Sequence, residues 1–131
     1  MARLIAKPAA EGLVPATIGD CTLDAIDHAA VTWVSPFHGQ VDAVADALDL
    51  PWPAPNQMTT NDTHRAIWFG PDQALIIGAS VAPEGAAVAD HSSAWATFLL
   101  SGPSAPDVLS RLTPLDIRDA AFPQGATART L

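Results

Sequence analysis

The sequence predicts an α+β fold made of duplicated β-α-β units with a mainly antiparallel sheet. Segments rich in β-branched and aromatic residues, bounded by Pro or Gly, are typical of strands. Apolar residues at helical spacing predict short helices between them. A strand–turn–helix pattern also occurs twice, in "WVSPFHGQVDAVADAL" (33–48) and "FLLSGPSAPDVLSRL" (98–112). Aligned on their helices, the two copies lie 64 residues apart, with Val44 over Val108 and Leu48 over Leu112.

The first unit, about 29–88, begins after a predicted extended arm at 1–19 that mixes Ala, Pro and Gly. A strand is expected over Ala29–Phe37, ended or placed at an edge by Pro36. A helix follows over about 41–48, because Val41, Val44, Ala45 and Leu48 form one apolar stripe. Two prolines then stop this helix and open a loop.

A hairpin is expected next, from the apolar segments 65–69 and 74–79, which are joined by the turn-forming residues "GPDQ". The segment 83–90 is weakly patterned and is expected to be a short helix or a loop. The two units together form one predicted domain over 20–131.

The second unit, about 89–131, contains an expected strand over 93–102 and a helix over 102–112. Either Pro103 at the first helical position or Ser104 as cap, with Asp107 three residues on, would start the helix. Its expected buried face is Val108, Leu109 and Leu112. A last strand is predicted at 126–130. It ends at Leu131 with no partner strand after it, so the second half is expected to be incomplete, with an edge open to another chain.

Composition excludes several functions. The chain has 131 residues, 49% of them apolar and only 15% charged, so part of the apolar surface is expected to meet a partner. Six basic residues against 14 acidic ones give a net charge of −8, which argues against binding nucleic acid or an anionic membrane. One cysteine and no long apolar segment or secretory signal predict a cytoplasmic protein.

No residue pattern predicts a catalytic, cofactor-binding or metal site in this chain. The histidines lack ligand spacing, and Asp90, His91 and Ser92 are adjacent, whereas a catalytic triad converges from separate elements. Ser92 is expected instead to form a turn with Asp90. Cys21 is interpreted as a structural thiol, and Gly70 and Gly102 belong to no phosphate loop. The histidines are His28, His38, His64 and His91.

Four tryptophans offer two interpretations: stacking on a planar ligand, or packing in the core and at an interface. Trp33, Trp68 and Trp95 lie in expected strands and are assigned to the core. Trp52 stands between two prolines in a loop and is expected to be the most exposed, as an anchor for a partner. The expected partner interface is Trp52, Phe122 and Leu131.

Motifs in the second half of the chain carry a family resemblance. They are L-S-G-P-x-A-x-x-x-L, then L-x-P-L-D, then F-P-x-G-x-x-A-x-T-L; the segment Trp68–Gly78 and the D-x-S of Asp90 and Ser92 also match. The sequence, over about 29–131, resembles the gamma subunit of heterotetrameric sarcosine oxidase. The matching positions are Leu100–Pro103, Ala105, Leu109, Leu112, Pro114–Asp116, Phe122, Pro123, Gly125, Ala128, Thr130 and Leu131.

The resemblance implies a fold like the folate-binding domain of the glycine-cleavage aminomethyltransferases, a duplication whose halves exchange strands. It implies a complex that oxidises sarcosine to glycine and can pass the one-carbon unit to tetrahydrofolate. FAD, FMN, NAD and tetrahydrofolate would then belong to the alpha and beta subunits, and this chain would support the alpha subunit without catalytic residues of its own. Family members continue beyond the T-L step with further strands and a helix.

Two alternatives stay open at this point. One is a module that binds folate, although an excess of acidic residues does not favour an anionic ligand. The other is a domain that associates with a copy of itself to complete its sheet, so that the isolated chain is a homo-oligomer.

Overall fold

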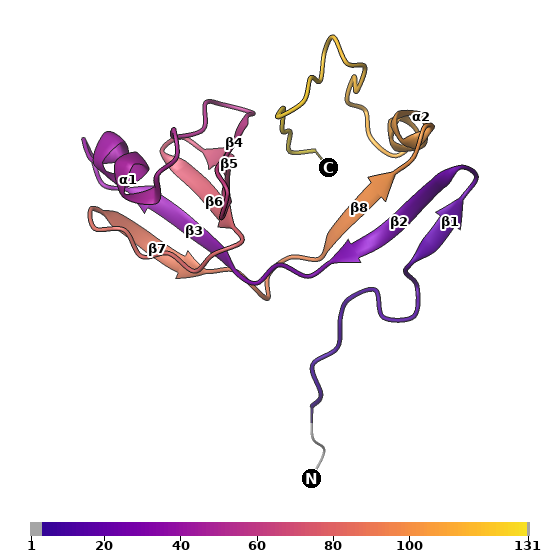
Figure 1. The fold of residues 1–131 in the computed structure, drawn as a ribbon, viewed down its shortest axis with the longest axis horizontal. Coiled ribbons are helices and arrows are strands. Elements are labelled where there is room, and N and C mark those ends of the chain that lie inside the picture. Colours follow the sequence, from indigo (N-terminus) through magenta and orange to yellow (C-terminus); the bar gives the residue numbers. More distant parts are fainter. Residues whose placement is uncertain (1–3, 131) are drawn as a thin grey trace.

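The computed structural model describes residues 4–130, which form two antiparallel sheets with one helix beside each (Figure 1). The large sheet has the order β4-β5-β6-β3-β7 and the small sheet the order β1-β2-β8. This arrangement confirms the predicted α+β class with antiparallel sheets. The bounds are β1 Ala16–Ile18, β2 Cys21–Ile26, β3 Val31–Pro36, α1 Val41–Leu48, β4 Met58–Thr60, β5 Arg65–Gly70, β6 Gln73–Ile77, β7 Ala86–Asp90, β8 Thr97–Ser101 and α2 Ala105–Ser110.

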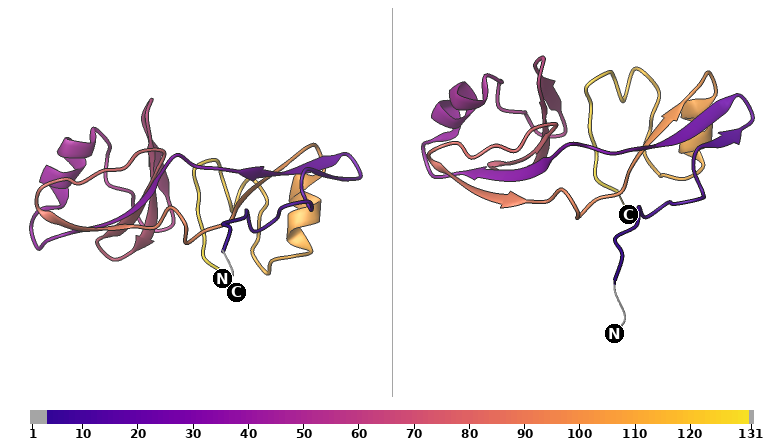
Figure 2. Two further views of the ribbon diagram at one scale, coloured as in Figure 1. Left: turned by 90° about the horizontal axis from the view of Figure 1, so that it is seen from below. Right: turned by 60° about the horizontal axis from the view of Figure 1, so that its bottom comes forward.

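The two sheets exchange strands. β2 precedes β3 in the chain but pairs with β8, and β7 precedes β8 but pairs with β3. The connections 27–30 and 91–96 therefore both run between the sheets, and Figures 1 and 2 show them crossing at the centre of the molecule. The amide of His91 donates to the Val31 carbonyl at 2.8 Å, which ties the segment 91–96 to the start of β3. This exchange is the one that the family resemblance implied.

The hydrophobic core lies between α1 and the large sheet. Val44 and Leu48 of α1 pack against Val34, Ala66, Ala74 and Ile76 of the sheet, all at most 5% exposed. α1 ends at Leu48, as predicted. There Asp49 adopts the left-handed conformation with a φ of 51°, and the Leu50 amide donates back to the Ala45 carbonyl. Leu50 thereby turns into the core before Pro51 and Pro53.

The predicted hairpin is confirmed as β5 and β6. Gly70 pairs with Gln73, which leaves Pro71 and Asp72 as the two turn residues. Pro fits the first turn position, and Asp72 takes a φ of 50°, the conformation that a type II turn needs at its second position. Gln73 also accepts a hydrogen bond from the Trp33 indole at 3.3 Å, which links the hairpin to the neighbouring strand.

Several element predictions were wrong. The segment 83–90, expected as a short helix or loop, contains β7. Residues 126–130 form no strand; only Ala126 makes an isolated antiparallel bridge, to Gln57. The predicted arm at 1–19, of which 1–3 lie outside the described residues, includes β1, whose three residues pair with β2. The strands β2 and β4 were missed. The division of the chain into the two units of 29–88 and 89–131 stays a prediction.

The predicted buried face of the second helix was also wrong. α2 is only six residues long and has no buried residue. Leu109 is 41% exposed and Leu112, just beyond the helix, is 75% exposed. Ser104 does occupy the cap position, but its hydroxyl donates to the Asp20 carboxylate at 3.0 Å instead of capping the helix.

Candidate interaction surface

The small sheet has one apolar face. Because side chains of paired antiparallel residues lie on the same face, Leu23 and Leu100 share a side with Ala25 and Phe98. Ile18, paired with Cys21, extends this face across β1. The opposite face carries Thr17, Thr22, Asp24, Ile26, Thr97, Leu99 and Ser101, so it is more polar.

This apolar face is poorly covered. Among the described residues of β1, β2, β8 and α2, Cys21 is the sole buried one. Phe98 remains 44% exposed and Ile18 45% exposed, whereas Val34 and Ile76 in the large sheet are completely buried. A domain normally buries such a face against a second layer of secondary structure, and within residues 4–130 this half has no complete second layer.

The start of α2 covers only one end of the face. Gly102, with a φ of 126°, allows the chain to pass so close to β2 that an added Cβ would lie 2.8 Å from the Cys21 Cα. Burial raises the pKa of the Cys21 thiol, and a hydrogen bond to Asp20 raises it further. The thiol is therefore protonated at neutral pH, unlike a reactive cysteine.

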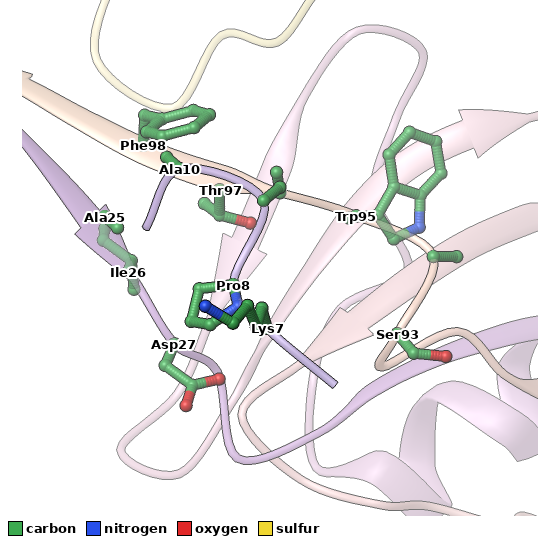
Figure 3. A pocket seen from close by; sticks show the side chains of 13 residues that line it. Lys7, Pro8, Ala10, Ala25, Ile26, Asp27, Ser93, Trp95, Thr97 and Phe98 are labelled. Atoms are coloured by element: carbon green, nitrogen blue, oxygen red, sulfur yellow. The ribbon is translucent and has the colours of Figure 1, made fainter. Parts of the chain in front are cut away.

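The N-terminal arm, residues 4–15, passes over the other end of the small sheet. Between the arm and the strands lies an open cavity of about 660 Å³, whose walls include Pro8, Ala10, Ala25, Trp95 and Phe98 (Figure 3). Ala10 is buried, but Leu4, Ile5 and Leu13 of the arm are 74–97% exposed. The arm therefore adds exposed apolar area beside that of the sheet.

The C-terminal segment, residues 111–130, returns to the large sheet and covers the edge strand β4. The Met58 amide donates to the Gly125 carbonyl at 2.9 Å, and the Thr127 amide donates to the Asn56 carbonyl at 2.8 Å. Arg129 donates to the Phe69 carbonyl at 2.7 Å and places its guanidinium 4.3 Å from the centre of the Phe69 ring. Phe69 in turn meets Trp95 edge to face, with ring centres 6.0 Å apart.

The structure describes two of the three residues of the expected interface. Trp52 is half-buried and packs against the core under α1, so the expectation that it is the most exposed tryptophan was wrong. Trp95, assigned to the core, is 49% exposed instead. Phe122 is half-buried in the C-terminal segment, and Leu131 lies outside the described residues. Participation of these residues in an interface stays a prediction.

The alternating pattern of residues 21–26 was the missed signal for this surface. Cys21, Leu23 and Ala25 point to one face and Thr22 and Asp24 to the other, as in a strand with one apolar side. No local sequence pattern predicted the exposure of Phe98 and Leu99, because exposure depends on whether distant segments of the folded chain cover them.

The predicted Asp90–Ser92 turn is confirmed. The Asp90 carboxylate accepts hydrogen bonds from the Ser92 hydroxyl at 2.6 Å and the Ser92 amide at 2.9 Å, and these bonds lower the pKa of Asp90. The Val31 amide donates to the same hydroxyl at 3.1 Å, which joins the segment 91–96 to the start of β3. Among the described residues, the His91 ring makes no hydrogen bond to either side chain, and its buried Nδ1 has no partner.

The other histidines also lie in structural surroundings. His64 bonds the Leu48 carbonyl through Nε2 at 2.9 Å and the Thr63 hydroxyl through Nδ1 at 2.8 Å, which ties the turn before β5 to the end of α1. His28 is half-buried and His38 is exposed. Within residues 4–130, no three His, Cys, Asp or Glu side chains are grouped so that they could hold a metal ion.

One surface ion pair joins Asp116 and Arg118 in the C-terminal segment. Asp116 accepts a hydrogen bond from the Arg118 Nε at 2.8 Å, and this partner lowers the pKa of the carboxyl to about 2. Both side chains are well exposed, so the contact orders a local turn.

In the part of the chain that the structure describes, no helix has the length and apolar character needed to span a membrane.

Comparisons with known proteins agree with this architecture. No protein-family model matches the sequence, and no curated protein matches it significantly. A solved structure does match: a chain of the heterotetrameric sarcosine oxidase from Corynebacterium sp. U-96, in complex with pyrrole 2-carboxylate, superposes with a TM-score of 0.69 at 22% sequence identity. The match covers 86% of this chain and 66% of that chain. This chain therefore has the fold of a sarcosine oxidase chain.

Proposed function

We propose that this chain is a non-catalytic, structural subunit of a sarcosine-oxidase-type complex. In that complex it would take the place of the gamma subunit and support the larger alpha subunit. The complex would oxidise sarcosine to glycine and transfer the one-carbon unit to tetrahydrofolate. FAD, FMN, NAD and tetrahydrofolate would be bound by the alpha and beta subunits, and the proposed location is the cytoplasm.

The observation that carries this proposal is the uncovered apolar face of the small sheet. A partner that covers Phe98 and its neighbours would supply the missing layer and remove their apolar area from water, at about 25 cal/mol per Å². The fold of a chain from a heterotetrameric enzyme supports an oxidase complex as the setting. The unreactive environment of Cys21 supports a structural role for that residue.

Co-expression tests the proposal. A tagged copy of this chain is produced together with the alpha and beta chains of a heterotetrameric sarcosine oxidase that lacks its own gamma chain. We expect the three chains to elute together and the assembly to oxidise sarcosine, while the purified single chain shows no turnover. Failure of both large chains to co-elute would contradict the proposal, as would sarcosine oxidation by this chain alone.

A further inference from the structure

A small polar cavity lies where the connection between β2 and β3 meets the turn before β5. Its volume is about 160 Å³, and it is lined by His28 of the connection, by the turn 60–65 and by residues 77–78 at the end of β6. This volume equals that of roughly five water molecules at about 30 Å³ each. The cavity therefore suits a ligand of about five or six non-hydrogen atoms.

Strand pairing places Arg65 on the face of the large sheet that points away from α1. Arg65 lies opposite Thr60 on β4 and Ile77 on β6, so these three side chains share one face. The core under α1 contains instead Ala66 and Ile76, which are the neighbouring residues along β5 and β6. A ligand can therefore reach Arg65 without opening the core.

Hydrogen bonds hold the turn that carries Asp62. The Asn61 side-chain oxygen accepts from the amides of Thr63 and His64, both at 2.9 Å. The Asn61 side-chain nitrogen donates to the Leu48 carbonyl at 3.3 Å, which ties the turn to the end of α1. A ligand therefore meets a turn that is already in position, and this lowers the entropy cost of binding.

The polar side chains of this turn have partners, but its two charged side chains do not. The Thr60 hydroxyl donates to the Asn61 carbonyl at 3.1 Å, and both ring nitrogens of His64 are engaged. Within residues 4–130, the side chains of Asp62 and Arg65 make no hydrogen bond and belong to no ion pair. Two opposite charges therefore line one small cavity without pairing with each other.

The charge of the whole chain selects among the ligands that this cavity can accept. The net charge of −8 repels a free anion, so Arg65 by itself makes a poor anion site. A simple cation would meet the like charge of Arg65 at close range. A ligand that carries both charges and is neutral overall avoids both penalties. An α-amino acid is such a ligand, because its carboxylate and its ammonium are attached to the same carbon.

We propose that this cavity binds a small zwitterionic amino acid, with Arg65 on its carboxylate and Asp62 on its ammonium. A guanidinium can hold a carboxylate through two parallel N–H···O bonds, and the Asp62 carboxylate accepts from the ammonium. A side chain about the size of a methyl group fits the remaining volume. This inference goes beyond the proposed function, since it concerns this chain alone and requires no partner subunit.

Titration of the isolated, isotope-labelled chain with L-alanine tests the proposal by NMR. We expect saturable shifts of the amides of 60–65 and 77–78, with a dissociation constant on the order of 1 mM, because a ligand this small makes few contacts. Acetate and methylammonium each carry one of the two charges, so each should bind at least about tenfold more weakly than L-alanine.

Two substitutions test the two charges separately. Arg65→Gln and Asp62→Asn should each weaken L-alanine binding at least about tenfold, because each removes one charge-assisted contact. Arg111→Gln and Asp72→Asn are the matched controls, since both residues are exposed and lie outside the cavity. The controls should bind as the unmodified chain does. All four variants should keep the unmodified circular dichroism spectrum, because the substituted side chains are exposed.

Three results would overturn the proposal. They are the absence of saturable shifts at 60–65, binding of acetate or methylammonium as tight as that of L-alanine, and unchanged affinity in either Arg65→Gln or Asp62→Asn. The proposed function does not depend on these results, because it is tested by co-elution with the alpha and beta chains.

Discussion

At the scale of single residues, Gly102 is the position where the chain passes closest to the start of β2. Its positive φ of 126° and the closeness of the Cys21 Cα leave no room for a side chain. We expect Gly102→Ala to lower the free energy of unfolding by about 2 kcal/mol or more, because backbone atoms of β2 would have to move. Urea denaturation followed by tryptophan fluorescence measures this. Gly12→Ala is the control: it also has a positive φ but no atom within 4 Å, so strain alone should cost about 1 kcal/mol. Equal losses in the two variants would show that the close approach to β2 is unimportant.

At the scale of elements, the two helices differ in what they bury, although the sequence presents them as copies. Leu48 in α1 is 5% exposed and belongs to the core, and Leu109 in α2 is 41% exposed. We therefore expect Leu48→Ala to cost about 2–5 kcal/mol of unfolding free energy and Leu109→Ala about 1 kcal/mol or less. The same denaturation experiment compares the two. A loss of about 3 kcal/mol for Leu109→Ala in the isolated chain would mean that α2 packs more deeply than the structure shows.

At the scale of the whole molecule, stability is concentrated in the large sheet. Its strand β6 has a neighbour on each side and lies under α1, whereas β8 has one neighbour and little cover. Amides of 74–77 should therefore exchange with deuterium at least about tenfold more slowly than those of 97–101 in the isolated chain. Hydrogen exchange followed by mass spectrometry or NMR measures both segments in one sample. Equal protection would mean that the exchanged strands couple the two sheets into a single unfolding unit.

The sequence by itself determined the local features of this protein. The apolar stripe of α1, the prolines after it and the "GPDQ" turn predicted the first helix and the hairpin correctly, because each depends on neighbouring residues. The Asp90–Ser92 turn was predicted for the same reason.

Only the tertiary structure decided which apolar residues are covered. Leu48 and Leu112 occupy equivalent positions in the repeated pattern, yet one is buried and the other is 75% exposed. Trp52, which was expected to be exposed, is half-buried, and Trp95, which was expected in the core, is exposed. Burial depends on distant segments, here the core under α1 and the connection between the sheets. The exchange of β2 and β7 likewise has no local signal, since strand pairing joins residues far apart in the chain. Hydrophobic pattern selects a strand or a helix, but the presence of a second layer over its apolar face is a property of the assembled fold.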